Sequence, residues 1–311
     1  GATVAGQAVA TSVLGGQIWR DDRKMFFKSI RWKEMRKGIV RHKKFPLLSS
    51  WSAFMNTTSS HLPPLMLAMF FSPVVVGFFA LGHRLLSMPM NFIGSAIAQV
   101  FYQRASAAKY DGTYDSIVRN AFTKLLTLGL FPILLVMIAG KDLFSFFFGS
   151  QWSEAGVYAQ ILAPWIMFQF ISSPISTLFS VLEMQGQGLV FNSLLLATRI
   201  ASLMVGGLLN SILIALMLYS ITGSIMYFSI CLFILKKSGL NLSMLVKNIF
   251  PICIIVFLAL LPVVIMRGFG VQPITTVAGG CISMLLYYVV IYFHDRDLRR
   301  LVSRILVHHS M

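Results

Sequence analysis

The chain has 311 residues and a mass of 34.7 kDa; 57% of its residues are hydrophobic, only 12% are charged, and its mean hydropathy is +0.77. Soluble domains average about 25% charged residues, so this composition leaves too little polar surface for a water-soluble fold. The 26 Lys and Arg exceed the 10 Asp and Glu and give a net charge of +16. In a soluble domain that charge would indicate nucleic acid, but here the basic residues gather between apolar runs, as in membrane proteins. We therefore expect an all-α, polytopic integral membrane protein with no nucleic-acid partner.

The cysteines and the first residues of the chain also bear on its class. Cys231, Cys253 and Cys281 lie inside apolar runs, without a CxxC pair or a nearby His at metal-ligand spacing. The sequence therefore predicts neither a disulfide framework nor a metal site.

The chain begins at Gly1 without a Met, and its first apolar stretch precedes the basic cluster, unlike a signal peptide. We expect Gly1 to be an internal residue of a longer protein.

Apolar runs of the length needed to cross a bilayer, about 20 residues, follow one another along the chain. Residues 1–18, rich in Gly, Ala and Val, look like the end of one such helix. The complete runs that follow are 47–72, 74–103, 122–140, 155–182, 189–209, 211–235, 247–266 and 272–293. Punctuation at Ser72-Pro73 and Asn210-Ser211 predicts tight helical hairpins.

The distribution of Lys and Arg predicts the orientation of these spans, because basic residues accumulate in cytoplasmic loops. If the basic segment 19–46 is cytoplasmic, alternation places 104–121, 183–188, 236–246 and 294–311 on the same side. With the helix-end Lys124 and Lys247 assigned to that side, only Lys141 and Arg267 among the basic residues outside the spans lie opposite. We expect a multi-pass protein with a cytoplasmic C-terminus.

Residues 26–40 interleave apolar and basic side chains. This pattern is typical of an amphipathic helix lying on anionic phospholipid headgroups. A plain positive-inside loop remains an equal alternative.

Ionisable residues at membrane depth are costly and usually face a bundle interior or a wet cavity, so they are candidate functional residues. Arg84 and Arg199 lie about ten residues, roughly 15 Å, inside their predicted helices. A structural Arg would need an acidic partner, yet no Asp or Glu lies well inside any predicted span. We therefore expect both arginines to face a cavity. His83 and His61 are equally consistent with a packing role and with a cavity lining.

Polar residues recur at helical spacing on four predicted spans, which suggests a shared hydrophilic cavity. The candidate substrate-binding residues from these stripes are Asn56, Asn91, Gln99, Gln169, Ser176 and Asn192. The alternative for any single Ser is a hydrogen bond to its own backbone or to a neighbouring helix. A cavity with buried positive charge and no acid suits an anion, and an Arg fork holds phosphate best.

Catalytic motifs are absent from the sequence: there is no GxSxG, HExxH, Walker loop or pair of carboxylates. The sequence thus predicts a protein that is not an enzyme and needs no cofactor.

Short motifs in residues 41–200 resemble the polysaccharide and O-antigen flippases of the Wzx type, which belong to the multidrug, oligosaccharidyl-lipid and polysaccharide exporter superfamily. The residues that carry the resemblance are Lys44-Phe45-Pro46, Ser49-Ser50-Trp51, Gly77-Phe78-Phe79-Ala80-Leu81 with Arg84 and Pro89, Ala96-Ile97-Ala98-Gln99-Val100-Phe101, Arg104-Ala105-Ser106, Phe148-Gly149 with Trp152, Glu154-Ala155-Gly156, Ala163-Pro164-Trp165 and Ser172-Ser173-Pro174. Arg84 matches the basic position of the family's Gly-Phe-x-Ala run.

The resemblance implies two six-helix lobes around a central cavity. On that template residues 1–18 end the first lobe, 19–46 form a basic cytoplasmic connection, and 47–235 form the C-terminal lobe. Residues 236–293 are then an additional helix pair and 294–311 a basic cytoplasmic tail, while the N-terminal lobe is missing from this chain.

The resemblance also implies a function in the bacterial inner membrane, namely transfer of an undecaprenyl-diphosphate-linked oligosaccharide to the outer leaflet by alternating access. Polysaccharide polymerase and glycosyltransferases are the implied protein partners. Two alternatives remain: a multidrug or cation exporter of the same superfamily, which should carry intramembrane acids, and a non-transporting membrane scaffold.

Overall fold

The computed structural model describes residues 48–108, 114–240 and 242–294, together with isolated residues among the first 37. The predicted helix end 1–18, the basic connection 19–46 with its amphipathic segment 26–40, and the basic tail 294–311 lie outside the continuous ranges except for His294. The chain divides into two units, 1–50 and 51–311, and the arrangement described below is that of the second.

Every regular element within the described ranges is helical, which confirms the predicted all-α class. The elements are α3 (Ser50–Phe70), α4 (Pro73–Ala107), α5 (Tyr114–Phe148), the short 3-10 helix η2 (Ser150–Trp152), α6 (Ser153–Ile175), α7 (Leu178–Val181), α8 (Gln185–Leu208), α9 (Ile212–Lys237), α10 (Leu242–Gly268) and α11 (Pro273–His294). Among the described residues, seven helical stretches are long and apolar enough to cross a membrane. The protein is therefore a multi-pass membrane protein, as predicted.

Helix α3 is less apolar than the other long helices and is not among those seven stretches. The predicted run 47–72 does fold as a helix of 21 residues, but Ser, Thr, Asn and His interrupt its apolar surface. Hydrogen bonds join α3 to α8: Asn192 Nδ2 donates to Ser52 Oγ at 2.8 Å, and Arg199 Nη1 donates to Ser59 Oγ at 2.7 Å. Ser52 and Ser59 of α3 thus find partners on a neighbouring helix, while Asn56 and His61 are exposed.

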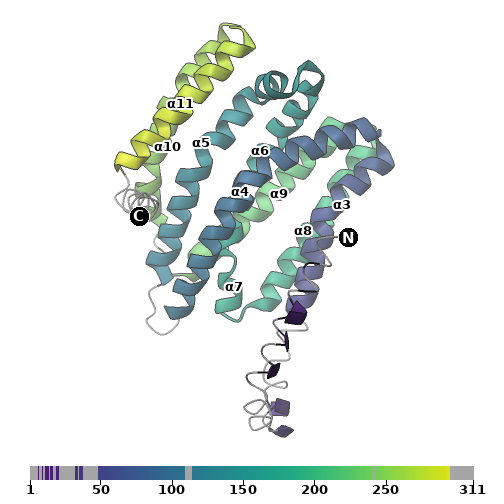
Figure 1. The fold of residues 1–311 in the computed structure, drawn as a ribbon, viewed down its shortest axis with the longest axis vertical. Helices are drawn as coiled ribbons and strands as arrows, with labels where there is room; N and C mark the ends of the chain where they lie inside the picture. Colours follow the sequence, from purple (N-terminus) through teal and green to yellow (C-terminus); the bar gives the residue numbers. More distant parts are fainter. Residues whose placement is uncertain are drawn as a thin grey trace. The chain divides into compact units, whose positions relative to one another are not determined.

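The chain turns between helices at both predicted hairpin points, and each turn has a local cause; α8 and α9 pack against each other, whereas α3 and α4 diverge after their turn (Figure 1). Ser72 caps α4, since its Oγ accepts a hydrogen bond from the Val75 N–H at 3.4 Å, and Pro73 occupies the first turn, where no intrahelical donor is needed. Ser211 caps α9 in the same way through the Ile214 N–H. Asn210 adopts a positive φ of 49°, a conformation that Asn tolerates better than most residues, and this allows the tight reversal between α8 and α9.

The predicted span 155–182 is not one helix. The helix α6 ends at Ile175, and the short α7 follows after a turn. Pro174 has no N–H and so interrupts the helical hydrogen-bond ladder. Ser176 Oγ donates to the carbonyl of Ser173 at 2.7 Å, and Thr177 Oγ1 donates to that of Pro174 at 2.8 Å, which supports the turn.

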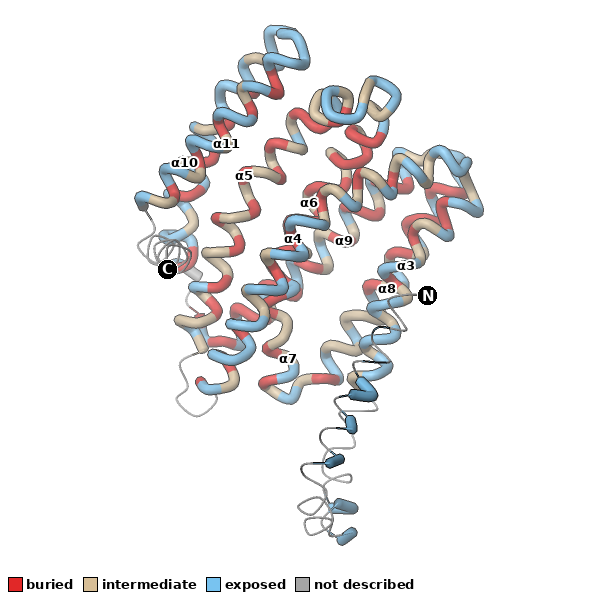
Figure 2. The backbone as a smooth tube through the Cα atoms, viewed as in Figure 1, coloured by how far each residue is buried: buried red, intermediate tan, exposed pale blue. Residues whose placement is uncertain are grey.

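Helix α6 is the centre of the helix bundle formed by residues 51–294. It packs against α4, α5 and α9, while α8 packs against α9 (Figure 1). In the apolar 18-residue window within 150–181, the stretch that contains α6, 61% of residues are buried, against 22% in the corresponding windows of α4 and of α8. Figure 2 shows the same contrast, with buried residues on several sides of α6 and exposed residues along the outer faces of its neighbours. Surfaces that face α6 are therefore interior positions.

Helices α10 and α11 form a pair that packs on α5 through a separate hydrophobic core (Figure 1). Two adjacent tyrosines of α11 reach the backbone of α5: Tyr287 donates to the carbonyl of Thr127 at 2.6 Å, and Tyr288 donates to that of Leu128 at 2.9 Å. Pro132 cannot provide the hydrogen bond that the Leu128 carbonyl would accept in a regular helix, so Tyr288 replaces it.

Candidate functional site

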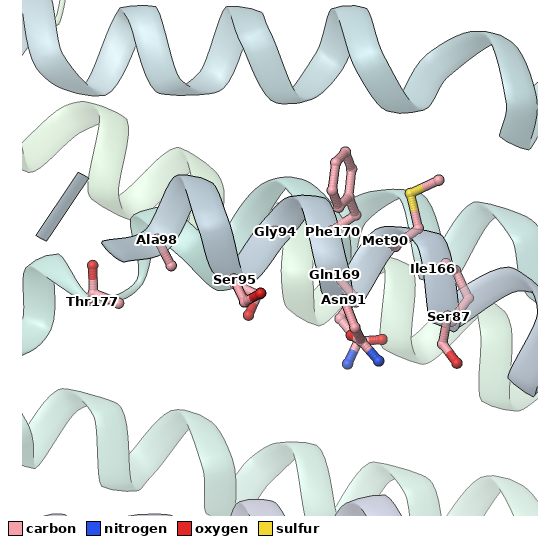
Figure 3. Close-up of a pocket in the computed structure, with 11 residues that line it drawn as sticks. Ser87, Met90, Asn91, Gly94, Ser95, Ala98, Ile166, Gln169, Phe170 and Thr177 are labelled. Atoms are coloured by element: carbon pink, nitrogen blue, oxygen red, sulfur yellow. The ribbon is translucent and has the colours of Figure 1, made fainter. Parts of the chain in front are cut away.

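A polar pocket lies between α4 and α6, within helices that are otherwise strongly apolar. Its volume is about 370 Å³. The residues that line it are Ser87, Met90, Asn91, Gly94, Ser95 and Ala98 from α4, Ile166, Gln169, Phe170 and Ser173 from α6, and Thr177 just beyond α6. Figure 3 shows the Asn91 and Gln169 side chains projecting in the same direction from the two helices.

Helical periodicity explains why these side chains meet. Ser87, Asn91 and Ser95 are four residues apart on α4, and Gln169, Ser173 and Thr177 follow the same spacing on and after α6. Side chains four apart lie above one another on one face of a helix, so each segment presents a single polar stripe. Where the two helices pack, the two stripes lie side by side and form one polar surface of the pocket (Figure 3).

Gly94 of α4 faces the Phe170 ring of α6 in the pocket. A Cβ atom at this position would lie 3.7 Å from the Phe170 ring, which is already ordinary van der Waals contact. Phe170 is buried, so the aromatic ring closes the pocket floor against α4. The pocket thus combines hydroxyl and amide groups with an aromatic and aliphatic floor.

The pocket's hydroxyl groups are partly engaged by their own helices. Ser95 Oγ donates to the carbonyl of Phe92 at 3.0 Å, and Thr177 Oγ1 donates to that of Pro174 at 2.8 Å. Each such hydroxyl retains its oxygen lone pairs as acceptors. The Asn91 amide makes no side-chain hydrogen bond to any other described residue, so its two donors and its carbonyl oxygen can serve a ligand.

No side chain that lines the pocket is charged. Arg84 lies three residues before Ser87 and seven before Asn91, which places it on the same face of α4, one turn beyond the pocket. Its side chain is exposed. The arrangement is a neutral, hydrogen-bonding pocket with a single cation next to one end.

Arg199 lies outside this pocket and is the largest fully buried side chain of the described part of the chain, with 2% of its surface exposed. Its Nη1 donates to the carbonyl and the hydroxyl of Ser59 at 2.8 and 2.7 Å. The guanidinium lies over Trp165 and Tyr219, with 5.2 and 5.4 Å to the ring centroids. In this conformation Arg199 therefore ties α8 to α3, α6 and α9.

His83 belongs to the same aromatic cluster as Arg199. Its ring stacks on Phe79 at 5.7 Å and on Trp165 at 5.5 Å, and Trp165 in turn packs edge-on against Tyr219. Residues 83 and 84 are therefore neighbours in sequence with opposite surroundings: His83 is half-buried between rings, while Arg84 is exposed.

The remaining predicted site residues are dispersed. Asn56 and His61 are exposed on α3, Gln99 is exposed on α4 one turn beyond Ser95, and Ser176 bonds the carbonyl of Ser173. Asn192 is held by Ser52. Of the predicted residues, Asn91 and Gln169 are those that the structure brings together in the pocket.

The sequence analysis missed Ser173 and Thr177, which line the pocket, and named Ser176 on the same segment. Ser172 is buried in the core with 1% of its surface exposed. The spacing of four from Gln169 through Ser173 to Thr177 was the pattern that could have found them. Within the described ranges, no group of three His, Cys, Asp or Glu is arranged to hold a metal ion.

Comparison with known proteins gives a match to a protein family. Residues 23–157 match the sequence profile of a polysaccharide biosynthesis protein family, which confirms the predicted resemblance over the segment and links it to polysaccharide biosynthesis. The matched segment includes the α4 wall of the pocket and ends before the α6 wall. No curated protein and no solved structure matches the chain.

Proposed function

We propose that this protein exports a lipid-linked oligosaccharide across the bacterial inner membrane, and that the pocket between α4 and α6 binds the sugars. The observation that carries the proposal is a neutral pocket of amides, hydroxyls and an aromatic floor between apolar membrane helices, one of which lies in the segment matched to polysaccharide biosynthesis. Sugars offer many hydroxyl groups that both donate and accept hydrogen bonds. Asn and Gln side chains provide both functions at fixed positions.

Arg84 is the proposed contact for the diphosphate that would link the sugar to its lipid. It lies one turn from the pocket on the same face of α4, and its exposed guanidinium can form charge-assisted hydrogen bonds with phosphate oxygens. α4 contains no Asp or Glu that would neutralise this arginine. In this proposal the sugars bind in the neutral pocket, and the diphosphate binds to Arg84 next to one end of it.

The proposed transport step is alternating access. The α4 and α6 walls would face the cytoplasm in one state and the opposite side in the other, while the lipid tail stays in the bilayer. Pro89 in α4 and Pro164 in α6 lie in the helices that form the pocket, and each removes a hydrogen bond from its helix. Such positions favour bending of the pocket walls.

A drug or cation exporter of the same superfamily fits the pocket less well. A cationic cargo calls for a carboxylate at membrane depth. The helices α3, α4, α8 and α9 contain no Asp or Glu, and the acidic residue of α6, Glu154, lies in its first turn.

A scaffold without transport activity is favoured by one observation, the local hydrogen bonds of the pocket hydroxyls. Ser87 and Ser95 bond carbonyls of α4 itself, as they would in a helix that is only packed. The Asn91 amide supports export over a scaffold, because its donors and its carbonyl oxygen remain available to a ligand.

The test is export of lipid-linked oligosaccharide by cells or vesicles that contain the full protein. Arg84→Ala should reduce export by roughly 10-fold to 100-fold, the equivalent of one charge-assisted contact, and leave membrane insertion unchanged. Asn91→Ala combined with Gln169→Ala should have a comparable effect. Arg267→Ala is the matched control, since Arg267 is also exposed but lies at the end of α10. Full export by Arg84→Ala would refute the diphosphate contact. Full export by Arg84→Ala and also by the double variant of Asn91 and Gln169 would refute the function.

A further inference from the structure

A second, apolar groove lies between α8 and α9 near α7, apart from the polar pocket. Its volume is about 490 Å³. The residues that line it are Phe179, Gly186, Gln187, Val190, Phe191, Leu194, Met226, Ser229, Ile230 and Phe233. None of them lines the pocket between α4 and α6.

The groove extends from the end of the helices toward their middle. Helices α8 and α9 are consecutive and joined by the tight turn at residues 209–211, so the start of α8 lies beside the end of α9. From Gly186 to Leu194 the groove spans nine residues of α8, a rise of about 12 Å. An open apolar groove of this direction and length accommodates part of a hydrocarbon chain that lies along it from the membrane surface.

The polar atoms of the groove do not call for a polar ligand. Ser229 Oγ donates to the carbonyl of Ile225 at 2.7 Å and is satisfied within α9. Gln187 lies in the first turn of α8, at the outer end of the groove. Deeper positions are Val190, Leu194 and Met226, which offer only apolar contact.

Two lysines stand at the outer end of the groove. Lys237 Nζ lies over the Phe233 ring, 6.0 Å from its centroid, and this ring is itself part of the groove wall. Lys236 is adjacent, and both lysines are exposed in the last turn of α9. A chain bound in the groove would therefore have its polar end next to two ammonium groups.

We infer that this groove binds one anionic phospholipid, with an acyl chain between α8 and α9 and its phosphate at Lys236 and Lys237. Charge complementarity selects this occupant: an anionic headgroup gains both ammonium groups, whereas the choline of a zwitterionic lipid brings a positive charge to the same place. A free phosphate ion would leave the apolar groove empty. The inference does not rest on the export function, since it concerns a groove between α8 and α9 and none of the residues of the pocket between α4 and α6.

The experiment uses the full protein in vesicles that contain phosphatidylglycerol or phosphatidylcholine with the same photoreactive group midway along one acyl chain. Mass spectrometry locates the crosslinks. Labelling at Val190, Leu194 or Met226 should be about fivefold to tenfold higher with phosphatidylglycerol, which corresponds to favourable contacts from one or two lysines. Lys236→Gln combined with Lys237→Gln should remove this preference. The matched control Lys141→Gln should keep it, because Lys141 lies near the opposite end of the helices.

Equal labelling by the two lipids, or an undiminished preference in the double lysine variant, would overturn the inference. A third arm adds unlabelled polyprenyl phosphate as a competitor. If it displaces the probe at concentrations well below those of unlabelled phosphatidylglycerol, the groove belongs to a polyprenyl lipid and the phospholipid assignment is wrong. Leu194→Trp, which fills the deep end of the groove, should lower labelling by both lipids while the protein remains folded, because Leu194 is 51% exposed and not a core residue.

Discussion

Arg199 and Ser59, which lie 140 residues apart in sequence, join α8 to α3 through two hydrogen bonds from one guanidinium nitrogen. Trp165 and Tyr219 cover the remaining faces of the cation at 5.2 and 5.4 Å, but the buried Arg199 Nε has no partner. A buried arginine is usually paired with a carboxylate, but here two aromatic faces and a hydroxyl contact the guanidinium instead. Such a charge is stable only while α3, α6 and α9 remain closed around it.

The first prediction is that Ser59 and Arg199 are strongly coupled. Ser59→Ala should lower the unfolding free energy by about 1.5–3 kcal/mol, the usual value of a hydrogen bond to a charged group, but by less than about 0.5 kcal/mol when Arg199→Met is already present. A double-mutant cycle in detergent micelles measures the difference. Ser60→Ala is the matched control, since its hydroxyl bonds the Asn56 carbonyl of its own helix. Additive effects of Ser59→Ala and Arg199→Met would contradict the coupling.

The second prediction concerns the bond between Tyr288 and the Leu128 carbonyl. Tyr288→Phe should destabilise the packing of α11 on α5 by about 0.5–1.5 kcal/mol, because one carbonyl at membrane depth loses its donor. In a Pro132→Ala background the same change should cost less, since an alanine at this position would supply the N–H that proline lacks. Thermal unfolding of the four proteins tests this. Tyr292→Phe serves as control for the loss of a hydroxyl on α11, and an equal cost of Tyr288→Phe with and without Pro132 would refute the explanation.

The third prediction concerns Gly140 and Gly156, where the backbones of α5 and α6 meet. A Cβ on Gly140 would lie 2.9 Å from the Gly156 carbonyl oxygen, and a Cβ on Gly156 would lie 2.7 Å from the Lys141 Cα. Since backbone atoms cannot yield like a flexible side chain, Gly156→Ala should cost about 1–3 kcal/mol of stability. Gly77→Ala is the control, because a Cβ there meets nothing within 4 Å. Unchanged melting temperatures for Gly156→Ala would show that the two helices can separate without loss.

Sequence patterns were sufficient for the features that depend on local chemistry. The hairpin points at Ser72-Pro73 and Asn210-Ser211 follow from caps and a positive φ, and both were predictable because the responsible residues are adjacent. The length of α6 was not predicted, since hydropathy continues through Pro174, whereas the helix gives way to a turn in which the Thr177 N–H donates to the carbonyl of Pro174, three residues earlier. Hydropathy thus locates spans well but places their ends poorly.

The depth of an arginine in its membrane helix does not by itself predict whether its side chain is buried or exposed. Arg84 and Arg199 have the same residue type and similar depth, yet one is exposed beside a pocket and the other is buried. The difference arises from contacts with Ser59, Trp165 and Tyr219, which a single helix pattern does not contain. Similarly, Ser172 and Ser173 are neighbours on α6, and the identity of the facing helix decides which of them lines the pocket.

The last prediction separates a water-filled pocket from packed polar stripes. In a protein without the three native cysteines, Asn91→Cys and Gln169→Cys should react with a membrane-impermeant thiol reagent from one side of the membrane, because both positions line the pocket. Arg199→Cys should react at least tenfold more slowly, since residue 199 is enclosed by four helices in this conformation. Sugar added to the aqueous phase should slow the reaction at position 91 and leave Arg84→Cys less affected. If positions 91 and 169 are as unreactive as 199, the pocket is dry, and the scaffold function explains the polar stripes better than export does.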